Sequence, residues 1–300
     1  MNWRDTRDFL GTCMPQAVRD EMEMLYPGEL REIRIRAGQP TVFCTAARQA
    51  SLDWTPDQRE VETVAEALSG HSLYARAEET GKGFVTLEGG HRMGLCGQVQ
   101  KRGGRRELTH ISSLCIRIAA EWPGTADELI SRVRCGDKLN SLLIIGAPGT
   151  GKTTLLRDLA RQLASGHDAV QTAVIDERGE LTAPVRGVPQ LDIGERTDVL
   201  DGCPKPEAVA WLIRAMCPQA IVTDELSGSE DAAAIMDAMA CGAAVMASVH
   251  GASLNDAASR PALAAMMARR VFSWYAVLSN EGSGRVAQMY DRSGSPVKPC

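Results

Sequence analysis

The amino-acid sequence predicts a two-domain protein, with a smaller α+β domain at residues 1–122 and a larger α/β domain at residues 123–300. The chain has 300 residues, which is more than one hydrophobic core usually organises. Its apolar pattern changes along the chain, from alternation in the front part to short continuous apolar runs between amphipathic helices in the rear part. The segment Trp122-Pro123-Gly124-Thr125 favours a turn and marks the expected boundary.

The front domain carries helix and strand signals in close succession. Residues 1–28 have helical apolar spacing, and we expect one helical run that ends at Pro27 and Gly28. Residues 32–36 alternate and turn into a partner strand at residues 41–44, which predicts a hairpin. Thr55 and Pro56 predict the start of a helix that runs to Gly70. A small sheet is expected next, with strands at residues 84–87, 93–100 and 113–118 and a basic loop at residues 101–106.

The rear domain is expected to contain a parallel sheet. Its strand candidates are continuous apolar runs, as in strands that are buried on both faces. These runs lie at residues 141–145, 169–175, 220–223 and 244–249, with a weaker pair at residues 275–278 and 285–290. Helical patterns separate them, which is typical of a doubly wound α/β fold.

A glycine-rich loop follows the first of these strands and precedes a helix. Glycines let backbone N–H groups converge on phosphate oxygens, and the helix start favours an anion. Lys152 is expected to reach the β- and γ-phosphates, and the hydroxyl of Thr153 to bind Mg²⁺. The order strand, loop and helix therefore predicts a RecA-like P-loop NTPase core with ATP and Mg²⁺ as ligands. The expected nucleotide-binding residues are Gly146, Ala147, Pro148, Gly149, Thr150, Gly151, Lys152, Thr153 and Thr154.

Two adjacent carboxylates end the strand at residues 220–223. Open α/β sheets bind ligands at the carboxyl ends of their strands, so both carboxylates are candidates for the same site. Asp224 is expected to hold the Mg²⁺ shell, and Glu225 to polarise the attacking water. A solvated acid pair at a strand end is the alternative.

Further candidates lie after two other strands. Glu177 is the rival candidate for the base, although it could instead belong to a charged turn. His250 is either a γ-phosphate sensor or a structural histidine. One arginine could stabilise the transition state at a neighbouring copy's nucleotide, whereas most arginines are surface or ion-pair residues. The candidates are Arg178, Arg186, Arg196 and Arg214, of which Arg196 is assigned a catalytic role.

Composition and charge narrow the function classes. The chain has a net charge of −5 and only 4% aromatic residues, which disfavours a nucleic-acid-binding platform. The basic loop at residues 101–106 is either a solvated hairpin tip or a docking site for a partner or lipid. Nine cysteines without a C-x-x-C pair, and an N-terminus without a signal-type apolar run, favour a cytoplasmic protein.

Several motifs together resemble the stage III sporulation protein AA family. The resemblance covers about residues 30 to 290. In the rear domain it is carried by residues 146–154, 174–180, 187–190, 192–205 and 221–225, and in the front domain by residues 32–36, 69–75, 89–97 and 111–118.

The resemblance implies a cytoplasmic ATPase on the mother-cell side of the channel that joins mother cell and forespore, with membrane-embedded channel subunits as partners. That family is similar in turn to the hexameric ATPases of type II and type IV secretion and of pilus assembly, which implies a homohexameric ring. By this likeness Glu177 belongs to an aspartate box and His250 to a histidine box. Those motors usually carry Gly-Glu where this chain has Asp224-Glu225, so Asp224 as the metal holder rests on general P-loop chemistry.

The sequence leaves three function classes to compare. A mechanochemical ATPase that drives or gates a membrane secretion or channel assembly during endospore formation is the main hypothesis. A nucleic-acid-dependent ATPase of RecA or transcription-terminator type is the alternative. A small-molecule kinase is weakened because no acceptor pocket or lid is evident in the sequence.

Overall fold

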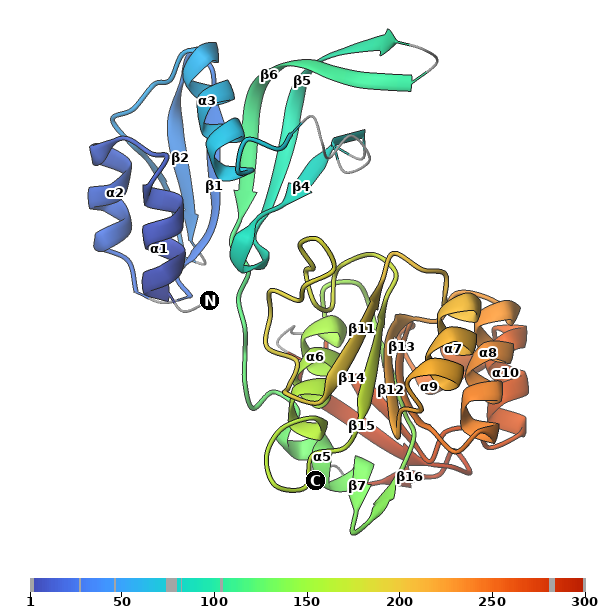
Figure 1. Cartoon of the computed structure of the whole chain (residues 1–300). Helices are drawn as coiled ribbons and strands as arrows, with labels where there is room; N and C mark the ends of the chain where they lie inside the picture. The colour runs from blue at the N-terminus through green and yellow to red at the C-terminus, as the bar shows by residue number, and fades with distance from the viewer. Residues whose placement is uncertain are drawn as a thin grey trace. The chain divides into compact units, whose positions relative to one another are not determined.

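A computed structural model describes residues 3–26, 28–45, 47–73, 80–81, 83–102, 105–280 and 284–298 (Figure 1). Pro27 and parts of two expected motifs, at residues 74–79 and 103–104, lie outside the described residues. The chain forms two compact units. The first contains residues 1–120 together with residues 183–191, and the second contains residues 121–182 and 192–300. The chain therefore passes from one unit to the other at three places, and each unit is described by itself below.

The first unit contains one six-stranded antiparallel sheet. The expected hairpin and the later strands are parts of the same sheet, because the strand Leu30–Arg36 pairs with both the strand that follows it and the strand Arg105–Arg117. The strand order is β3-β2-β1-β6-β5-β4. The strands are β1 (Leu30–Arg36), β2 (Gln39–Thr45), β3 (Gln49–Ser51), β4 (Phe84–Thr86), β5 (Arg92–Arg102) and β6 (Arg105–Arg117), and a 3₁₀ turn at Glu88–Gly90 joins β4 to β5.

The N-terminal helical segment is interrupted. Helix α1 spans Trp3–Gly11 and helix α2 spans Gln16–Glu23, so the prediction of one uninterrupted run was wrong. Pro15 precedes α2 with extended backbone angles, and the proline ring and its missing N–H explain the break. Both helices bury apolar side chains, including Leu10, Val18 and Met22, in the core of this unit.

Helix α3 (Gln58–Leu68) begins later than the sequence suggested. Its N-cap is Asp57, whose carboxylate accepts from the backbone N–H of Glu60, while the Glu60 carboxylate accepts from the N–H of Asp57. This capping box satisfies two N–H groups that the helix itself leaves free. Val61, Val64 and Leu68 are buried on the inner face of α3 and pack with the core.

Strands β5 and β6 form a hairpin that is longer than expected. Their ladder continues to Arg102 opposite Arg105, so most of the expected basic loop is strand. Gly103 and Gly104, and the side chains of residues 102–107, lie outside the described residues. The register shifts next to Gly97, where a Cβ atom would lie 1.7 Å from the carbonyl oxygen of His110. Only glycine allows such a close approach of the two backbones.

The second unit is built on an eight-stranded sheet of order β11-β10-β12-β13-β9-β14-β15-β16. The first six strands in this order run parallel, and β15 and β16 are antiparallel additions. The strands are β9 (Leu142–Gly146), β10 (Thr172–Asp176), β11 (Thr197–Asp201), β12 (Ala220–Glu225), β13 (Ala244–His250), β14 (Trp274–Leu278), β15 (Val286–Asp291) and β16 (Pro296–Val297), and a small hairpin pairs β7 (Arg134–Cys135) with β8 (Lys138–Leu139).

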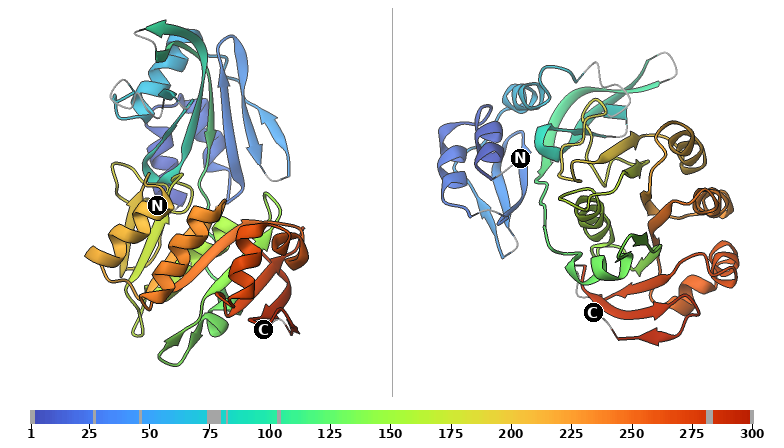
Figure 2. Two further views of the ribbon diagram at one scale, coloured as in Figure 1. Left: turned by 90° about the vertical axis from the view of Figure 1, so that its right-hand side faces the viewer. Right: turned by 60° about the horizontal axis from the view of Figure 1, so that its bottom comes forward.

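Helices cover both faces of this sheet. Figure 2 shows the green helices on one side of the strands and the orange and red helices on the other. One face packs against α5 (Asp127–Val133) and α6 (Lys152–Leu163), in a core that includes Ile144, Leu155 and Val222. The other face packs against α7 (Lys205–Ala215), α8 (Ser229–Ala240), α9 (Leu254–Ala258) and α10 (Pro261–Ala268). Among the described residues, no helix is long and apolar enough to cross a membrane.

The parallel arrangement decides where polar side chains meet. Gly146 lies opposite His250 in the pairing of β9 with β13, and Ser248 lies opposite Glu225 in the pairing of β13 with β12. The carboxyl ends of these three neighbouring strands therefore share one edge of the sheet. This edge is where an open α/β sheet places its ligand.

Candidate functional site

The loop between β9 and α6 is shaped by glycine and by internal hydrogen bonds. Gly149 and Gly151 have φ angles of 78° and 96°, a region that L side chains rarely adopt. A Cβ atom on Gly146 would lie 2.5 Å from Oγ1 of Thr150, which is closer than two such atoms can approach. The Thr150 hydroxyl donates to the Ala147 carbonyl at 2.9 Å. The loop therefore leads into the N-terminus of α6, whose first N–H groups favour an anion.

Lys152, the first residue of α6, lies folded back over this loop. Its Nζ donates to the carbonyl oxygens of Gly146 and Ala147, both at 2.9 Å, and lies 3.1 Å from Nδ1 of His250. The side chain is buried, and this desolvation lowers its pKa against the opposing effect of Asp224 and Glu225. Backbone carbonyls are weaker partners for an ammonium group than charged phosphate oxygens are. Lys152 is thus placed to exchange these carbonyls for phosphate.

Asp224 joins the loop helix to two strands. Its Oδ2 accepts from the hydroxyl of Thr153 at 3.3 Å, and its Oδ1 accepts from the hydroxyl of Ser248 at 3.0 Å. A threonine hydroxyl and a carboxylate are oxygen donors of the kind that Mg²⁺ prefers, and Mg²⁺ commonly takes its remaining ligands from water and phosphate. Within the described ranges, no group of three or more His, Cys, Asp and Glu side chains could hold a metal by itself. The donor set at Asp224 therefore fits Mg²⁺ bound together with a phosphate.

Glu225 lies next to Asp224 but makes different contacts. The pairing of β12 with β13 is irregular between Thr223 and Glu225, so the two adjacent carboxylates do not follow simple strand alternation. Oε2 of Glu225 lies 3.3 Å from Nε2 of His250 and 3.3 Å from Nη1 of Arg178. When Nδ1 of His250 accepts from Lys152, its Nε2 carries the proton and donates to Glu225. Lys152, His250, Glu225 and Arg178 thus form a continuous polar chain.

Glu177 lies in a separate ion pair. Its Oε2 accepts from Nζ of Lys205 at 2.7 Å, and Lys205, the first residue of α7, is itself buried. The described contacts therefore link Glu177 to α7, whereas they link Glu225 to His250 and Arg178.

Asp176, the residue before Glu177, shapes the turn that follows β10. Its buried carboxylate accepts from the N–H groups of Glu180, Leu181 and Thr182 at 2.7–3.1 Å, and from the Thr182 hydroxyl at 2.7 Å. With four donors on its two oxygens, this carboxylate is occupied by the chain itself. Asp176 therefore holds the backbone of the turn.

Arg157 is a further charged residue near this edge that sequence reasoning did not single out. Its guanidinium donates to the carbonyl oxygens of Leu181 and Glu180 at 2.6 and 2.8 Å. Burial lowers its pKa, while the nearby carboxylates of Glu121, Asp176 and Asp224 act in the opposite direction. The signal was weak because a single arginine in an amphipathic helix usually faces solvent. Arg157 ties α6 to the turn that Asp176 shapes.

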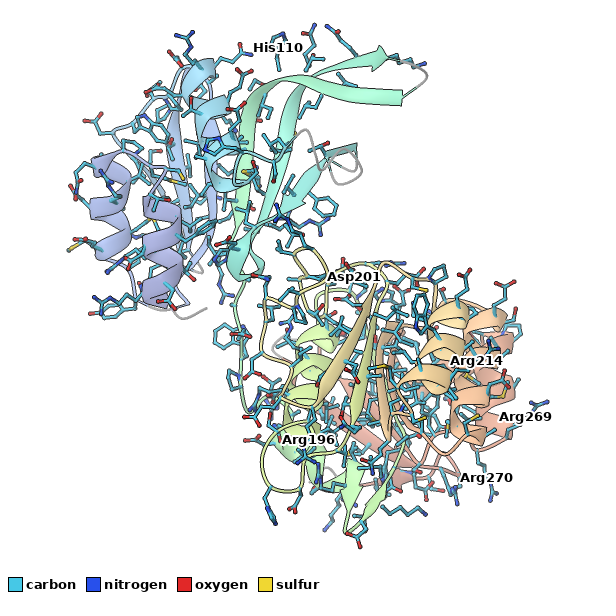
Figure 3. All side chains as sticks on the ribbon, viewed as in Figure 1. His110, Arg196, Asp201, Arg214, Arg269 and Arg270 are labelled. Atoms are coloured by element: carbon cyan, nitrogen blue, oxygen red, sulfur yellow. The ribbon has the colours of Figure 1, made fainter. Side chains whose placement is uncertain are left out.

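The remaining arginine candidates lie elsewhere. Arg196 donates to the Ala169 carbonyl at 2.7 Å and precedes β11, so it lies at the amino edge of the sheet. Figure 3 shows Arg196 and Asp201 at opposite ends of this strand, with Arg214 on α7. In the described part of the chain, Arg178 is the one of the four candidates with a recorded contact to a side chain of the site.

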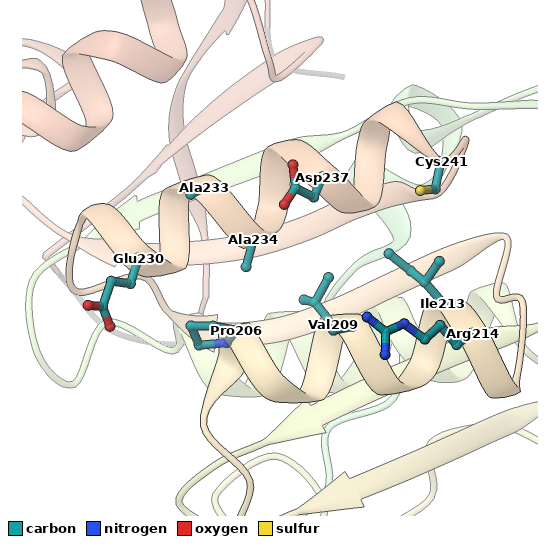
Figure 4. A pocket seen from close by; sticks show the side chains of 10 residues that line it. Pro206, Val209, Ile213, Arg214, Glu230, Ala233, Ala234, Asp237 and Cys241 are labelled. Carbon is teal, nitrogen blue, oxygen red and sulfur yellow. The ribbon is translucent and has the colours of Figure 1, made fainter.

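A groove lies between α7 and α8, away from the glycine loop (Figure 4). Its volume is about 450 Å³, its floor includes Val209, Ile213 and Ala234, and its rim carries Glu230 and Asp237. None of its lining residues belongs to the loop or to the acidic strand ends. The chemistry-bearing residues therefore gather at the carboxyl edge of the sheet and not in this groove.

Sequence comparisons relate nearly the whole chain to one family. A family model described as "Sporulation stage III, protein AA" matches residues 8–297. Stage III sporulation protein AA of Bacillus subtilis (strain 168) is 40% identical over 272 residues, which are 89% of this chain and 88% of that protein. Protein SEEDLING PLASTID DEVELOPMENT 1 of Arabidopsis thaliana is 27% identical over 161 residues, which are 53% of this chain and 23% of that protein.

Solved structures with a similar fold include an ATPase and a pilus retraction motor. The Legionella pneumophila ATPase DotB has a TM-score of 0.57 at 15% identity, covering 88% of this chain and 77% of its own. The pilus retraction motor PilT with bound ADP has a TM-score of 0.58 at 13% identity, covering 87% and 76%. At this level of identity the likeness concerns the fold. It confirms the predicted RecA-like P-loop core with an N-terminal α+β domain.

Proposed function

The chain belongs to the sporulation stage III protein AA family, as its motifs indicated, and from this premise we propose that it is an ATPase that hydrolyses ATP to ADP and phosphate. Its work is to drive or gate a membrane secretion or channel-type assembly during endospore formation. The family membership supports the sporulation context, and the fold shared with DotB and PilT supports the use of ATP.

One observation carries the proposal: the glycine loop and the acidic strand end meet at a common point. The Thr153 hydroxyl lies 3.3 Å from the Asp224 carboxylate, and Lys152 lies over the loop on the same turn of helix. Residues 146–154, apart from Pro148, which has no N–H, would hold the phosphates through their backbone N–H groups. Lys152 would neutralise the β- and γ-phosphates. Thr153 and Asp224 would hold Mg²⁺, which when bound spreads the charge that develops on the phosphate oxygens.

Glu225 is the proposed general base. Its carboxylate would take a proton from water as the water oxygen bonds to the γ-phosphorus and the bond to the β-phosphate oxygen breaks, leaving its electron pair on ADP. His250 would orient this carboxylate through Nε2 and respond to the position of Lys152 through Nδ1. Glu177 is the second candidate base, and its contact with Lys205 instead of His250 favours Glu225.

Assembly and partners complete the proposal. We propose a homohexameric ring that acts from the mother-cell cytoplasm on membrane-embedded channel subunits, with Arg196 supplied to the nucleotide of a neighbouring copy. The fold shared with a pilus retraction motor supports a mechanical role. The amino-edge position of Arg196 supports action on a second copy, because its own loop lies at the opposite edge of the sheet.

The test is steady-state phosphate release by the purified full-length protein with Mg-ATP. Lys152→Ala should abolish nucleotide binding, and Glu225→Gln should abolish turnover while binding persists. Lys138→Ala and Glu128→Gln, which replace exposed residues of the same types, are the matched controls and should turn over normally. Turnover that survives in both site variants would refute the assignment. Stimulation by DNA or RNA with a steep salt dependence would instead favour the nucleic-acid-dependent class.

A further inference from the structure

Arg178 occupies an unusual place in the polar chain. Nη1 of Arg178 lies 3.3 Å from Oε2 of Glu225. Nε2 of His250 lies 3.3 Å from the same oxygen. His250 in turn contacts Lys152, whose Nζ lies over the phosphate loop. This series of polar contacts therefore has a cationic side chain at each end, Lys152 and Arg178, and the carboxylate of the proposed base Glu225 between them.

The contact of Arg178 with Glu225 is weak enough to exchange. The Arg178 side chain is 64% exposed and the Glu225 side chain 24% exposed. Exposed ion pairs of this kind contribute little stability because water solvates both partners well. By contrast, half-buried Arg157 donates to two backbone carbonyls of the turn, and Arg161 bonds to Asp158.

The backbone that carries Arg178 is held by several hydrogen bonds, whereas its mostly exposed side chain makes the single contact with Glu225. Asp176 accepts four hydrogen bonds from residues 180–182, and Arg157 donates to two carbonyls of the same turn. Arg178 lies inside this turn, next to the end of β10. Its guanidinium can therefore change partner without a rearrangement of the chain.

We propose that Arg178 recognises the γ-phosphate of the nucleotide bound to its own chain, and that it does so by leaving Glu225. This inference rests on the proposed ATPase function. While Arg178 contacts Oε2 of Glu225, its positive charge lowers the basicity of the carboxylate that is proposed to accept the proton of the attacking water. A triphosphate offers Arg178 several charged oxygens, and bidentate guanidinium–phosphate bonds are stronger than a single exposed contact to a carboxylate. The base is then released only when a γ-phosphate is present.

The experiment compares a diphosphate with a triphosphate. Dissociation constants of Mg-ADP and of Mg-AMP-PNP are measured by calorimetry for the wild-type chain and for Arg178→Ala, Arg178→Lys and Arg269→Ala. Arg269 is an exposed residue at the end of α10, and its guanidinium contacts Met236 of α8 (Figure 3). Arg178→Ala should weaken AMP-PNP binding about tenfold and change ADP binding by less than about twofold. Arg178→Lys should recover part of the lost AMP-PNP affinity, and Arg269→Ala should bind AMP-PNP and ADP as the wild-type chain does.

A second variant tests the exchange itself. Glu225→Gln removes the partner that competes for Arg178, so AMP-PNP should bind about two- to fivefold more tightly relative to ADP. This gain should vanish in the double variant with Arg178→Ala. Equal weakening of both nucleotides by Arg178→Ala, or no weakening of either, would overturn the inference and leave the ATPase assignment standing. A wild-type chain that binds neither nucleotide would overturn both.

Discussion

At the scale of the residue, sequence order could predict which side chains to examine, because a loop after one parallel strand and acids after another must share an edge of the sheet. It could not predict Ser248. Serine at a strand end is common, and only the register of β12 against β13 places it beside Asp224. The ion pair of Glu177 with Lys205 could not be predicted either, because Lys205 is distant in sequence and only the fold brings the start of α7 beside Glu177.

Ser248 gives a prediction about metal affinity. Its hydroxyl donates to Oδ1 of Asp224 and so orients the carboxylate that is proposed to hold Mg²⁺. Loss of such a supporting hydrogen bond typically weakens metal affinity tenfold or more. We expect Ser248→Ala to raise the Mg²⁺ concentration for half-maximal ATP hydrolysis by about tenfold, with a smaller change at saturating Mg²⁺. Ser259→Ala, at the end of α9, is the control, and an unchanged Mg²⁺ titration for Ser248→Ala would contradict the role.

His91 gives a prediction about pH. It is buried, its Nδ1 accepts from the N–H of Ala119 at 3.0 Å, and no described atom bonds to its Nε2. Burial lowers its pKa from 6.5 to about 4. As the pH falls below 6.5, His91 binds a proton in the unfolded chain, whereas in the folded chain it stays neutral until about pH 4. Stability is therefore lost across this window, by about 3 kcal/mol in total.

The measurement is the free energy of unfolding in urea between pH 7 and pH 4. His91→Gln cannot titrate, so its stability should fall less steeply with acid than that of the wild-type chain, whatever its stability at pH 7. His167→Gln, which replaces an exposed histidine, should keep the wild-type slope. Parallel pH curves for wild type and His91→Gln would show that His91 does not hold its neutral form in the fold.

At the scale of the element, the periodicity of apolar residues predicted which helices and strands exist better than it predicted where they begin and end. The continuous apolar strands of the parallel sheet were expected because burial on both faces leaves a clear pattern. Strand β11 was missed because three of its five residues, Thr-Asp-Val-Leu-Asp, are polar. It forms the edge of the sheet, where solvent replaces one neighbouring strand. The break between α1 and α2 was missed because apolar spacing continues across Pro15, although the proline itself signals the break.

The β5–β6 hairpin gives a prediction about backbone approach. A Cβ on Gly97 would lie 1.7 Å from the His110 carbonyl, so Gly97→Ala must separate the two strands. We expect it to reduce the free energy of unfolding by about 3 kcal/mol. Gly94 lies on the same strand, where the nearest atom to an added Cβ is 3.6 Å away, so Gly94→Ala should change stability by less than about 1 kcal/mol. Similar urea midpoints for the two variants would refute the close contact.

At the scale of the whole molecule, the sequence indicated two domains with one crossing, whereas residues 183–191 also pack with the first unit. Within that unit, the side chain of Gln190 accepts from the N–H of Gly89. Composition could not predict this insertion, because a short segment without strong periodicity carries no signal for the core it joins. It begins directly after the Asp176 turn, so this turn connects the proposed nucleotide site to the first unit through the chain itself.

The proposed catalytic role of Arg196 predicts that two inactive variants recover ATP turnover when they are mixed, provided that they assemble together. Because it lies at the amino edge of the sheet and its own phosphate loop lies at the carboxyl edge, a catalytic role requires a second copy. Lys152→Ala chains lack a working loop but carry Arg196, and Arg196→Ala chains have the converse defect. In an equimolar random mixture half of the loops are intact and half of their neighbours supply the arginine, so about one quarter of wild-type turnover should return.

The control mixes chains whose defects belong to one site. Lys152→Ala with Glu225→Gln should recover no activity, since Lys152 and Glu225 are joined through His250 in the same chain. Lys152→Ala with Arg178→Ala should also stay near the sum of its parts, because Arg178 contacts its own Glu225. If the Arg196 mixture shows no gain while sedimentation confirms mixed assemblies, Arg196 merely fastens the Ala169 loop. The negative charge that develops in the transition state would then be stabilised by residues of one chain, and Arg178, which contacts Glu225, is the candidate arginine.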